Sequence, residues 1–249
     1  MKRWSDSDVS LLKKLWFDTS KKDLMRIFQD RTWKSLQRKA DKFKLKRYRA
    51  TLDPYLKIEP WIEGEMLSDG YVGPDGRYGH TTKYSSYAEF LKEKFSSIDK
   101  TVTVHPHKYV DRRTDKEYSR CLVRTRSFFK GYRDRWYVGK KKIVPNDLIV
   151  NDTVFLHWFL GDGTVNKQGY GCSLATMGFD KNDVVKLKNK LLEYGIDSSI
   201  TKDNNINILK TEKSINIIKS FLDNIEYPDC YSYKFDRLEL WLSKFKGTK

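Results

Sequence analysis

One short segment occurs twice in this chain, and it restricts the fold more than any other feature. The first copy runs from Trp61 to Asp69 and the second from Val154 to Asp162, and a glycine follows each aspartate. In both copies an apolar run of helical length precedes the aspartate and a strand-like pattern follows it. The two aspartates lie 93 residues apart, so each copy can open an αβ unit of similar size. The repeat predicts two units related by pseudo-twofold symmetry, with the aspartates meeting where the units pack.

Two carboxylates at helix C-termini predict a bound cation. The negative end of a helix dipole disfavours an anion and favours a cation beside it. Two such charges at 4 Å also repel by about 4 kcal/mol at an effective dielectric of about 20. Mg²⁺ takes one or two protein carboxylates and completes its shell with water and phosphate oxygens, so Asp69 and Asp162 match a hard-ion site better than a zinc site. The alternative is that each aspartate only caps a neighbouring turn.

The charge distribution predicts a polyanionic partner. The chain carries a net charge of +16, with +10 in residues 1–50 and +8 in residues 101–150, on either side of a block of −3. Nucleic acid accounts for these basic blocks most simply. No apolar run approaches the length of about 18–20 residues needed for a membrane span, and no signal peptide follows Met1. With three unpaired-looking cysteines, we expect a soluble intracellular protein of the cytoplasm or an organelle matrix, without membrane contact.

Residues 1–47 predict a small all-α domain of three helices. Ser5 with Asp8, and Ser20 with Asp23, have the spacing of a capping box. The residues expected to close the core are Val9, Leu12, Leu15, Trp16, Leu24, Ile27, Phe28, Trp33, Leu36, Ala40 and Phe43.

The third of these helices predicts a DNA-reading surface. Lys34, Gln37 and Arg38 suit base edges and phosphates in a major groove. With Trp4 and Trp33, the segment resembles a Myb-like helix-turn-helix module. The alternative is a bundle whose charged face is only solvated.

The rest of the chain divides into a linker at residues 48–59, a first unit at 60–148 and a second unit at 149–249. Turn signals and periodicity predict helix, hairpin, helix, hairpin and helix in each unit, with a further helical tail. In the first unit Arg120, Arg124 and Arg126 alternate along one strand, which predicts one basic sheet face that fits duplex DNA. Further DNA contacts are expected from Arg77, Lys83 and Lys202.

The two Asp-Gly segments resemble the ends of the signature helices of single-chain LAGLIDADG homing endonucleases. The resemblance spans roughly residues 55–245, and the segments 174–179 and 231–234 also resemble the second repeat of that family. It implies a mixed α+β fold in which two αββαββα repeats form a DNA-binding saddle, acting as a monomer that requires no protein partner. It further implies a metal-dependent, staggered double-strand break in a long DNA site, with Mg²⁺ or Mn²⁺ as cofactor. A gene carried by a mobile intron, intein or phage would also be in keeping with this family.

The same resemblance implies a set of site residues. Asp69 and Asp162 would be catalytic and bind metal, with the main-chain carbonyls of Ser68 and Gly161 as additional ligands. Lys142 and Lys234 match the active-site lysines, although Lys140 and Lys141 compete with Lys142 by position. The sequence departs from the family pattern where His157 stands opposite the small residue Gly64, which excludes strict symmetry of the two helices.

Two other classes of function remain open at this stage. A non-cleaving relative would act as an RNA maturase or as a DNA-binding regulator. A helix-turn-helix transcription factor with an unrelated ligand domain would lack the paired aspartates.

Overall fold

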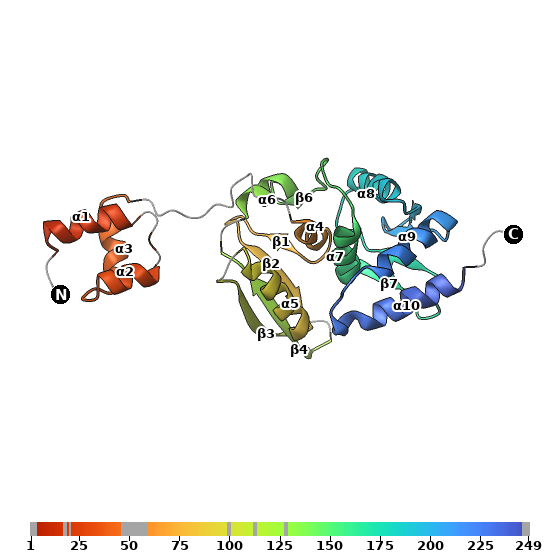
Figure 1. The fold of residues 1–249 in the computed structure, drawn as a ribbon, viewed down its shortest axis with the longest axis horizontal. Coiled ribbons are helices and arrows are strands. Elements are labelled where there is room, and N and C mark those ends of the chain that lie inside the picture. Colours follow the sequence, from red (N-terminus) through yellow and green to blue (C-terminus); the bar gives the residue numbers. More distant parts are fainter. Residues whose placement is uncertain are drawn as a thin grey trace. The chain divides into compact units, whose positions relative to one another are not determined.

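A computed structural model describes residues 4–16, 19, 21–45, 59–98, 101–111, 114–126 and 129–245. The chain forms two compact units, Met1–Ala50 and Thr51–Lys249, and we describe each by itself (Figure 1). The expected linker 48–59 lies outside the described residues apart from Glu59, and so does the capping residue Ser20. Within the described part of the chain, no helix is both long and apolar enough to cross a bilayer.

The N-terminal unit contains the three predicted helices, α1 (Asp6–Leu15), α2 (Lys21–Ile27) and α3 (Trp33–Lys42). The Ser5 hydroxyl accepts a hydrogen bond from the backbone N–H of Asp8, as the capping signal predicts. The buried residues of this core are Leu12, Trp16, Leu24, Phe28, Leu36 and Ala40.

The prediction that Ile27 belongs to this core is wrong, because its side chain is 45% exposed. Leu24 and Phe28 lie one helical turn apart and supply the buried side of α2. Ile27 is turned about 100° from Phe28 around the helix and falls outside that side.

The second unit contains the two predicted αββαββα repeats, and this confirms the mixed α+β fold class. The first repeat consists of α4 (Pro60–Leu67), β1 (Tyr71–Val72), β2 (Tyr78–Thr82), α5 (Ser85–Ser96), β3 (Thr103–Asp111), β4 (Lys116–Arg124) and α6 (Lys130–Trp136). The second consists of α7 (Asp152–Asp162), β7 (Gly163–Val165), β8 (Cys172–Leu174), α8 (Lys181–Tyr194), β9 (Ser198–Ile200), β10 (Ile206–Ile208) and α9 (Glu212–Asp223). A hairpin of β5 (Tyr137–Val138) and β6 (Lys141–Lys142) joins the repeats, and a short 3₁₀ helix (Asp229–Tyr231) leads into α10 (Ser232–Ser243).

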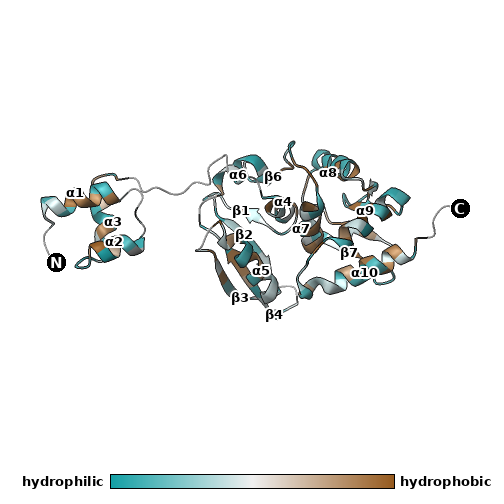
Figure 2. Cartoon of the chain, viewed as in Figure 1, coloured by the Kyte–Doolittle hydropathy of each residue, from teal (hydrophilic) through white to brown (hydrophobic). Residues whose placement is uncertain are grey.

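The two four-stranded sheets have the same topology. Their strand orders are β1-β2-β4-β3 and β7-β8-β10-β9, and all pairs are antiparallel. Helix α5 packs against β2, β3 and β4 of the first sheet, and α8 packs against β9 of the second. The brown and teal bands of α8 in Figure 2 reflect its amphipathic pattern. Strand β4 ends at Arg124, so the prediction that Arg126 lies on that strand is wrong. The backbone ladder ends here because the N–H of Tyr78 donates to the side-chain hydroxyl of the buried Thr125 and not to a backbone carbonyl. The alternation of burial itself continues to Arg126, which is exposed.

Helices α4 and α7 pack directly against each other at the centre of this unit (Figure 1). Both are buried on all sides, from Trp61 to Leu67 and from Val154 to Leu160, which explains why their sequences are apolar without a polar face. A Cβ added to Gly64 would lie 2.6 Å from the Cβ of His157. The equivalent positions of the two helices therefore meet each other, with glycine on one side and histidine on the other.

We expect Gly64→Ala to reduce the free energy of unfolding by about 2–3 kcal/mol, because overpacking costs exceed the gain in helix propensity. The added carbon would lie 2.5 Å from the carbonyl oxygen of Val154, and backbone cannot move aside as a flexible side chain can. Urea denaturation measures the effect. Gly131→Ala in α6 is the matched control, because its new methyl group meets nothing within 4 Å. Equal stability of Gly64→Ala and the wild type would show that the helices do not approach this closely.

Candidate active site

The two predicted aspartates lie at neighbouring helix ends. Asp162 is the last residue of α7, and Asp69 lies in the turn that follows α4. A Cβ added to Gly161 would lie 2.4 Å from the Cβ of Ser68 and 3.5 Å from the backbone nitrogen of Asp69. Residues from positions 93 apart in the chain therefore form one seam.

The electrostatics of Asp162 also reflect the convergence of the two acids. Burial, together with the negative charge of Asp69, raises the pKa of Asp162 to about 7, against the opposing charges of Lys142 and Lys234. Asp69 is exposed at the mouth of the site. Burial and the like charge of Asp69 both disfavour the ionised carboxylate of Asp162, and a bound cation would favour it.

Lys142 lies at the end of α4. Its ammonium group donates hydrogen bonds to the carbonyl oxygens of Gly70 at 2.7 Å and Ser68 at 3.2 Å. Burial lowers the pKa of Lys142 to about 8, although Asp162 and Asp69 favour its charged form. The two competing lysines point elsewhere, because Lys141 pairs with Asp180 at 2.9 Å and Lys140 is exposed.

Lys234 occupies the equivalent place at the end of α7. Its ammonium group donates to the carbonyl oxygens of Leu160 at 2.7 Å, Phe159 at 3.1 Å and Gly161 at 3.2 Å. Burial lowers its pKa to about 8, as for Lys142. Each signature helix thus ends in free carbonyl groups that receive one lysine, a favourable placement of a cation.

The oxygen atoms at this seam fit a hard divalent ion. Ser68 and Asp69 lie against Gly161, and the charge of Asp69 acts on the adjoining Asp162, so the two carboxylates and the carbonyl groups of Ser68 and Gly161 belong to one seam. A carbonyl oxygen has two lone pairs, so the hydrogen bond from a lysine leaves one for a metal. Within the described residues, no group of three or more His, Cys, Asp or Glu side chains is arranged for a metal. The donor set suits an ion that keeps several water ligands.

The expected DNA-contacting residues of the second unit are all exposed. Arg120 and Arg124 alternate on the open face of β4. The Arg77 side chain lies 3.2 Å from Asp75 in the β1–β2 turn. Lys83 follows β2, Lys202 lies in the β9–β10 turn, and Arg126 lies just beyond β4. The structure therefore gathers only Arg120 and Arg124 on a strand, in the first sheet, and places the other four residues in turns or just beyond strand ends.

A model of the LAGLIDADG DNA endonuclease family matches residues 61–218 of this chain. The chain belongs to this family. The matched segment includes both signature helices and Lys142, whereas Lys234 lies beyond it.

Three similar proteins extend the comparison. An uncharacterized protein of Methanocaldococcus jannaschii is 35% identical over 165 residues, which cover 63% of this chain and 64% of that protein. A cytochrome b mRNA maturase of Debaryomyces hansenii is 34% identical over 77 residues, covering 30% of this chain and 29% of the maturase. The chain thus spans less than two thirds of either relative. The solved structure of the homing endonuclease I-WcaI bound to its DNA recognition sequence superposes with a TM-score of 0.61 at 20% identity, covering 86% of this chain and 97% of that one.

Sequence reasoning missed a buried polar cluster in this LAGLIDADG chain. The carboxylate of Glu65 is fully buried and accepts hydrogen bonds from the hydroxyl groups of Tyr78 and Tyr87. The Nδ1 atom of His157, from α7, lies 2.8 Å from Oε1 of Glu65. The Nδ1 atom of His80 lies 2.7 Å from Oε2, close enough for an ion pair although its angle is poor for a hydrogen bond. The signal in the sequence was the pair of acids, Glu63 and Glu65, inside an otherwise apolar helix.

This cluster carries charge and exists in one repeat. Burial raises the pKa of Glu65, but the charge of His80 and the contact with His157 outweigh it and hold the pKa well below its usual range. Glu65 in turn raises the pKa of His80 against the effect of burial, and Asp69 acts in the same direction. The second repeat has Trp158 at the position of Glu65 and Leu174 at the position of His80. The polar cluster therefore lies next to one half of the site, and apolar side chains lie next to the other half.

The N-terminal unit presents the predicted basic side chains. Lys34, Gln37 and Arg38 are exposed on α3. A surface hollow of about 450 Å³ beside this helix is lined by Trp4, Thr32, Lys34, Ser35, Arg38, Lys39 and Lys42. Four of these residues are cationic, so the surface suits an anionic partner.

Proposed function

We propose that this chain is a site-specific DNA endonuclease that makes a Mg²⁺-dependent, staggered double-strand break in a long target. The observation that carries the proposal is the meeting of Asp69 and Asp162 at one seam, with Lys142 and Lys234 placed equivalently on either side. The I-WcaI structure, a homing endonuclease on its recognition sequence, supports DNA as the partner of a protein with this fold.

Each residue of the site has a role in this chemistry. A bound divalent ion supplies an activated water and neutralises charge on the phosphate. Asp69 and Asp162, with the carbonyl groups of Ser68 and Gly161, would hold Mg²⁺, and Mn²⁺ as a substitute. The ammonium groups of Lys142 and Lys234 would steady the negative charge that develops at each scissile phosphate. The proposed enzyme acts as a monomer, because one chain supplies both halves of the site.

The N-terminal unit would add affinity outside the cleaved region. We propose that α3 enters a major groove as in a helix-turn-helix module, with Lys34, Gln37 and Arg38 as its contacts. Two DNA-binding units on one chain raise the effective concentration of each for the same duplex.

Single lysine variants should nick DNA. With one lysine removed, we expect cleavage of one strand to slow by about 10²-fold or more, because one charged group of that half-site is lost. Lys142→Met and Lys234→Met should affect opposite strands, and end-labelled duplexes resolve which strand is cut. Lys141→Met is the matched control, since its side chain pairs with Asp180 outside the site. Equal slowing of both strands by either variant would contradict the assignment of one lysine to each half-site.

The proposed function is tested by incubating the protein with a fragmented genomic library in Mg²⁺ and sequencing the broken ends. We expect recurrent breaks within one long sequence, with ends offset by a constant number of nucleotides, and none in EDTA. Breaks without a shared sequence, or no breaks at all, would contradict the proposal.

The sequence similarity to the maturase favours one other function, namely assistance of intron splicing without DNA cleavage. The genomic assay separates the two, because a non-cleaving maturase leaves the library intact. It would bind structured intron RNA more tightly than a duplex DNA of equal length in a filter-binding assay.

A further inference from the structure

The open faces of the two sheets can be compared residue by residue. In the first sheet, Gly79 pairs with Arg124, and Arg124 pairs with Thr103 on its other side. In the second sheet, Ser173 pairs with Asn207, and Asn207 with Ser199. We call each set a cross-strand row. The first row consists of Tyr71, Gly79, Arg124 and Thr103. The second row consists of Thr164, Ser173, Asn207 and Ser199.

Arg124 and Asn207 are equivalent positions in these rows. Each lies on the third strand of its sheet in spatial order, and each is exposed. Their neighbours along the strand, Val123 and Ile208, are buried, so the two side chains project from the open face. Each row begins on the strand that directly follows one of the two aspartates, at Tyr71 and at Thr164, so Arg124 and Asn207 lie the same number of strands from Asp69 and Asp162.

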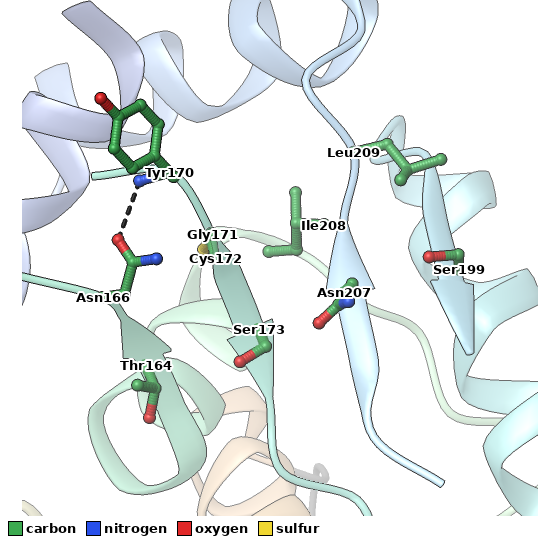
Figure 3. A pocket seen from close by; sticks show the side chains of 10 residues that line it. All are labelled: Thr164, Asn166, Tyr170, Gly171, Cys172, Ser173, Ser199, Asn207, Ile208 and Leu209. Atoms are coloured by element: carbon green, nitrogen blue, oxygen red, sulfur yellow. Dashed lines mark hydrogen bonds between the residues drawn. The ribbon is translucent and has the colours of Figure 1, made fainter. Parts of the chain in front are cut away.

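The surroundings of the two residues differ. On the first sheet the ring of Tyr71 lies over Gly79, where a Cβ would be 2.4 Å from the ring. The guanidinium of Arg124 lies 3.9 Å from Asp75, close enough to orient it but too far for a hydrogen bond. On the second sheet the row is made of small polar side chains, and it lines a hollow of about 320 Å³ (Figure 3).

We propose that Arg124 and Asn207 read one base each at symmetry-related positions of the target, guanine through Arg124 and adenine through Asn207. The inference rests on the proposed function, and it assigns a base preference to each half-site. Arginine makes two hydrogen bonds to O6 and N7 of guanine, and asparagine makes two to N6 and N7 of adenine. In the first row Tyr71 covers Gly79, and the long side chain of Arg124 can reach a base edge from beside it. In the second row the side chain of Asn207 is short, so a base edge must enter the hollow to meet it.

The test is selection of bound sequences from a randomised duplex library in EDTA, so that binding is scored without cleavage. We compare the wild type, Arg124→Asn, Asn207→Arg and the double variant. Arg124→Asn should change the preferred base at one position of the selected sequences from guanine to adenine, and the ratio of the two bases there should change by about ten-fold or more. Asn207→Arg should make the opposite exchange at the symmetry-related position, and the double variant should combine both. Lys219→Asn and Asn216→Arg, exposed on α9, are the charge-matched controls and should leave both preferences unchanged.

The possible failures are distinguishable. If the wild type selects a defined site but the two variants leave its base preferences unchanged, the inference is overturned and the proposed function stands. Loss of affinity without a change in preference would assign Arg124 and Asn207 to phosphate contacts and would also overturn it. If the wild type enriches no sequence, the inference fails together with the proposed function.

Discussion

Asp162→Asn is expected to lower the rate of double-strand cleavage by about 10³-fold or more while DNA affinity stays within a few-fold. The amide keeps the shape of the side chain but removes the charge that would hold a divalent ion and stabilise the transition state, an effect of several kcal/mol. Folding should not suffer, because burial and the charge of Asp69 already raise the pKa of Asp162 to about 7. The neutral amide resembles the protonated carboxyl group that the metal-free site favours.

The measurement is cleavage of a plasmid carrying the target, with fluorescence anisotropy of a labelled duplex to follow binding. Asp69→Asn should have the same effect, because the two acids share the seam. Asp203→Asn, an exposed aspartate in the β9–β10 turn, is the matched control and should cleave at the wild-type rate. Full cleavage by Asp162→Asn in Mg²⁺ would show that Asp162 does not hold the catalytic metal ion.

Glu65→Leu should cost about 3–5 kcal/mol of unfolding free energy, the largest stability effect that we expect from one substitution. Removing one partner of a buried ion pair leaves the other charged and unsatisfied. Here the substitution would remove the partner of the His80 ring and of the Tyr78 and Tyr87 hydroxyl groups at once, and all three lie within the core. Urea denaturation at neutral pH measures the change.

A second substitution separates the energy of the Glu65–His80 ion pair from the effect of side-chain packing. The second repeat has Leu174 where the first has His80, so His80→Leu is an apolar replacement that this fold already accepts. The double variant Glu65→Leu/His80→Leu should recover about 1–2 kcal/mol relative to Glu65→Leu alone. Glu93→Leu, on the exposed side of α5, should stay within about 0.5 kcal/mol of the wild type. Strict additivity of the two core substitutions would contradict the coupling of Glu65 and His80.

The sequence predicted those parts of the site that depend on local pattern and on duplication. The two helix ends were predicted because an apolar run followed by Asp-Gly has a local cause, namely a buried helix and a tight turn. Their convergence was predicted because two equal units pack about a twofold axis. The choice of Lys142 among three adjacent lysines needed the structure, since only the β5–β6 hairpin decides which side chain faces Gly70.

Other features depend on contacts between distant elements and had no local signature. Glu65 collects partners from β2, α5 and α7, so no spacing in the sequence identifies its cluster. The alternation that predicted Arg126 on β4 extends beyond the end of the strand, which is set by the hydrogen bond from the N–H of Tyr78 to the side chain of Thr125. The equivalence of Arg124 and Asn207 required the register of both sheets, because the hairpins of the two repeats differ in length.

The pKa of Asp162 tests most directly the claim that two distant aspartates share one site. It can be measured by carbon-13 NMR on the metal-free protein, in the wild type and in Asp69→Asn. The wild-type pKa should be about 7, so Asp162 loses its proton and becomes able to bind a divalent ion as the pH rises through that value. Asp69→Asn should lower the pKa of Asp162, because a neighbouring negative charge is removed, whereas Lys142→Met should raise it. A pKa of Asp162 that is the same with and without the charge of Asp69 would show that the two carboxylates do not meet.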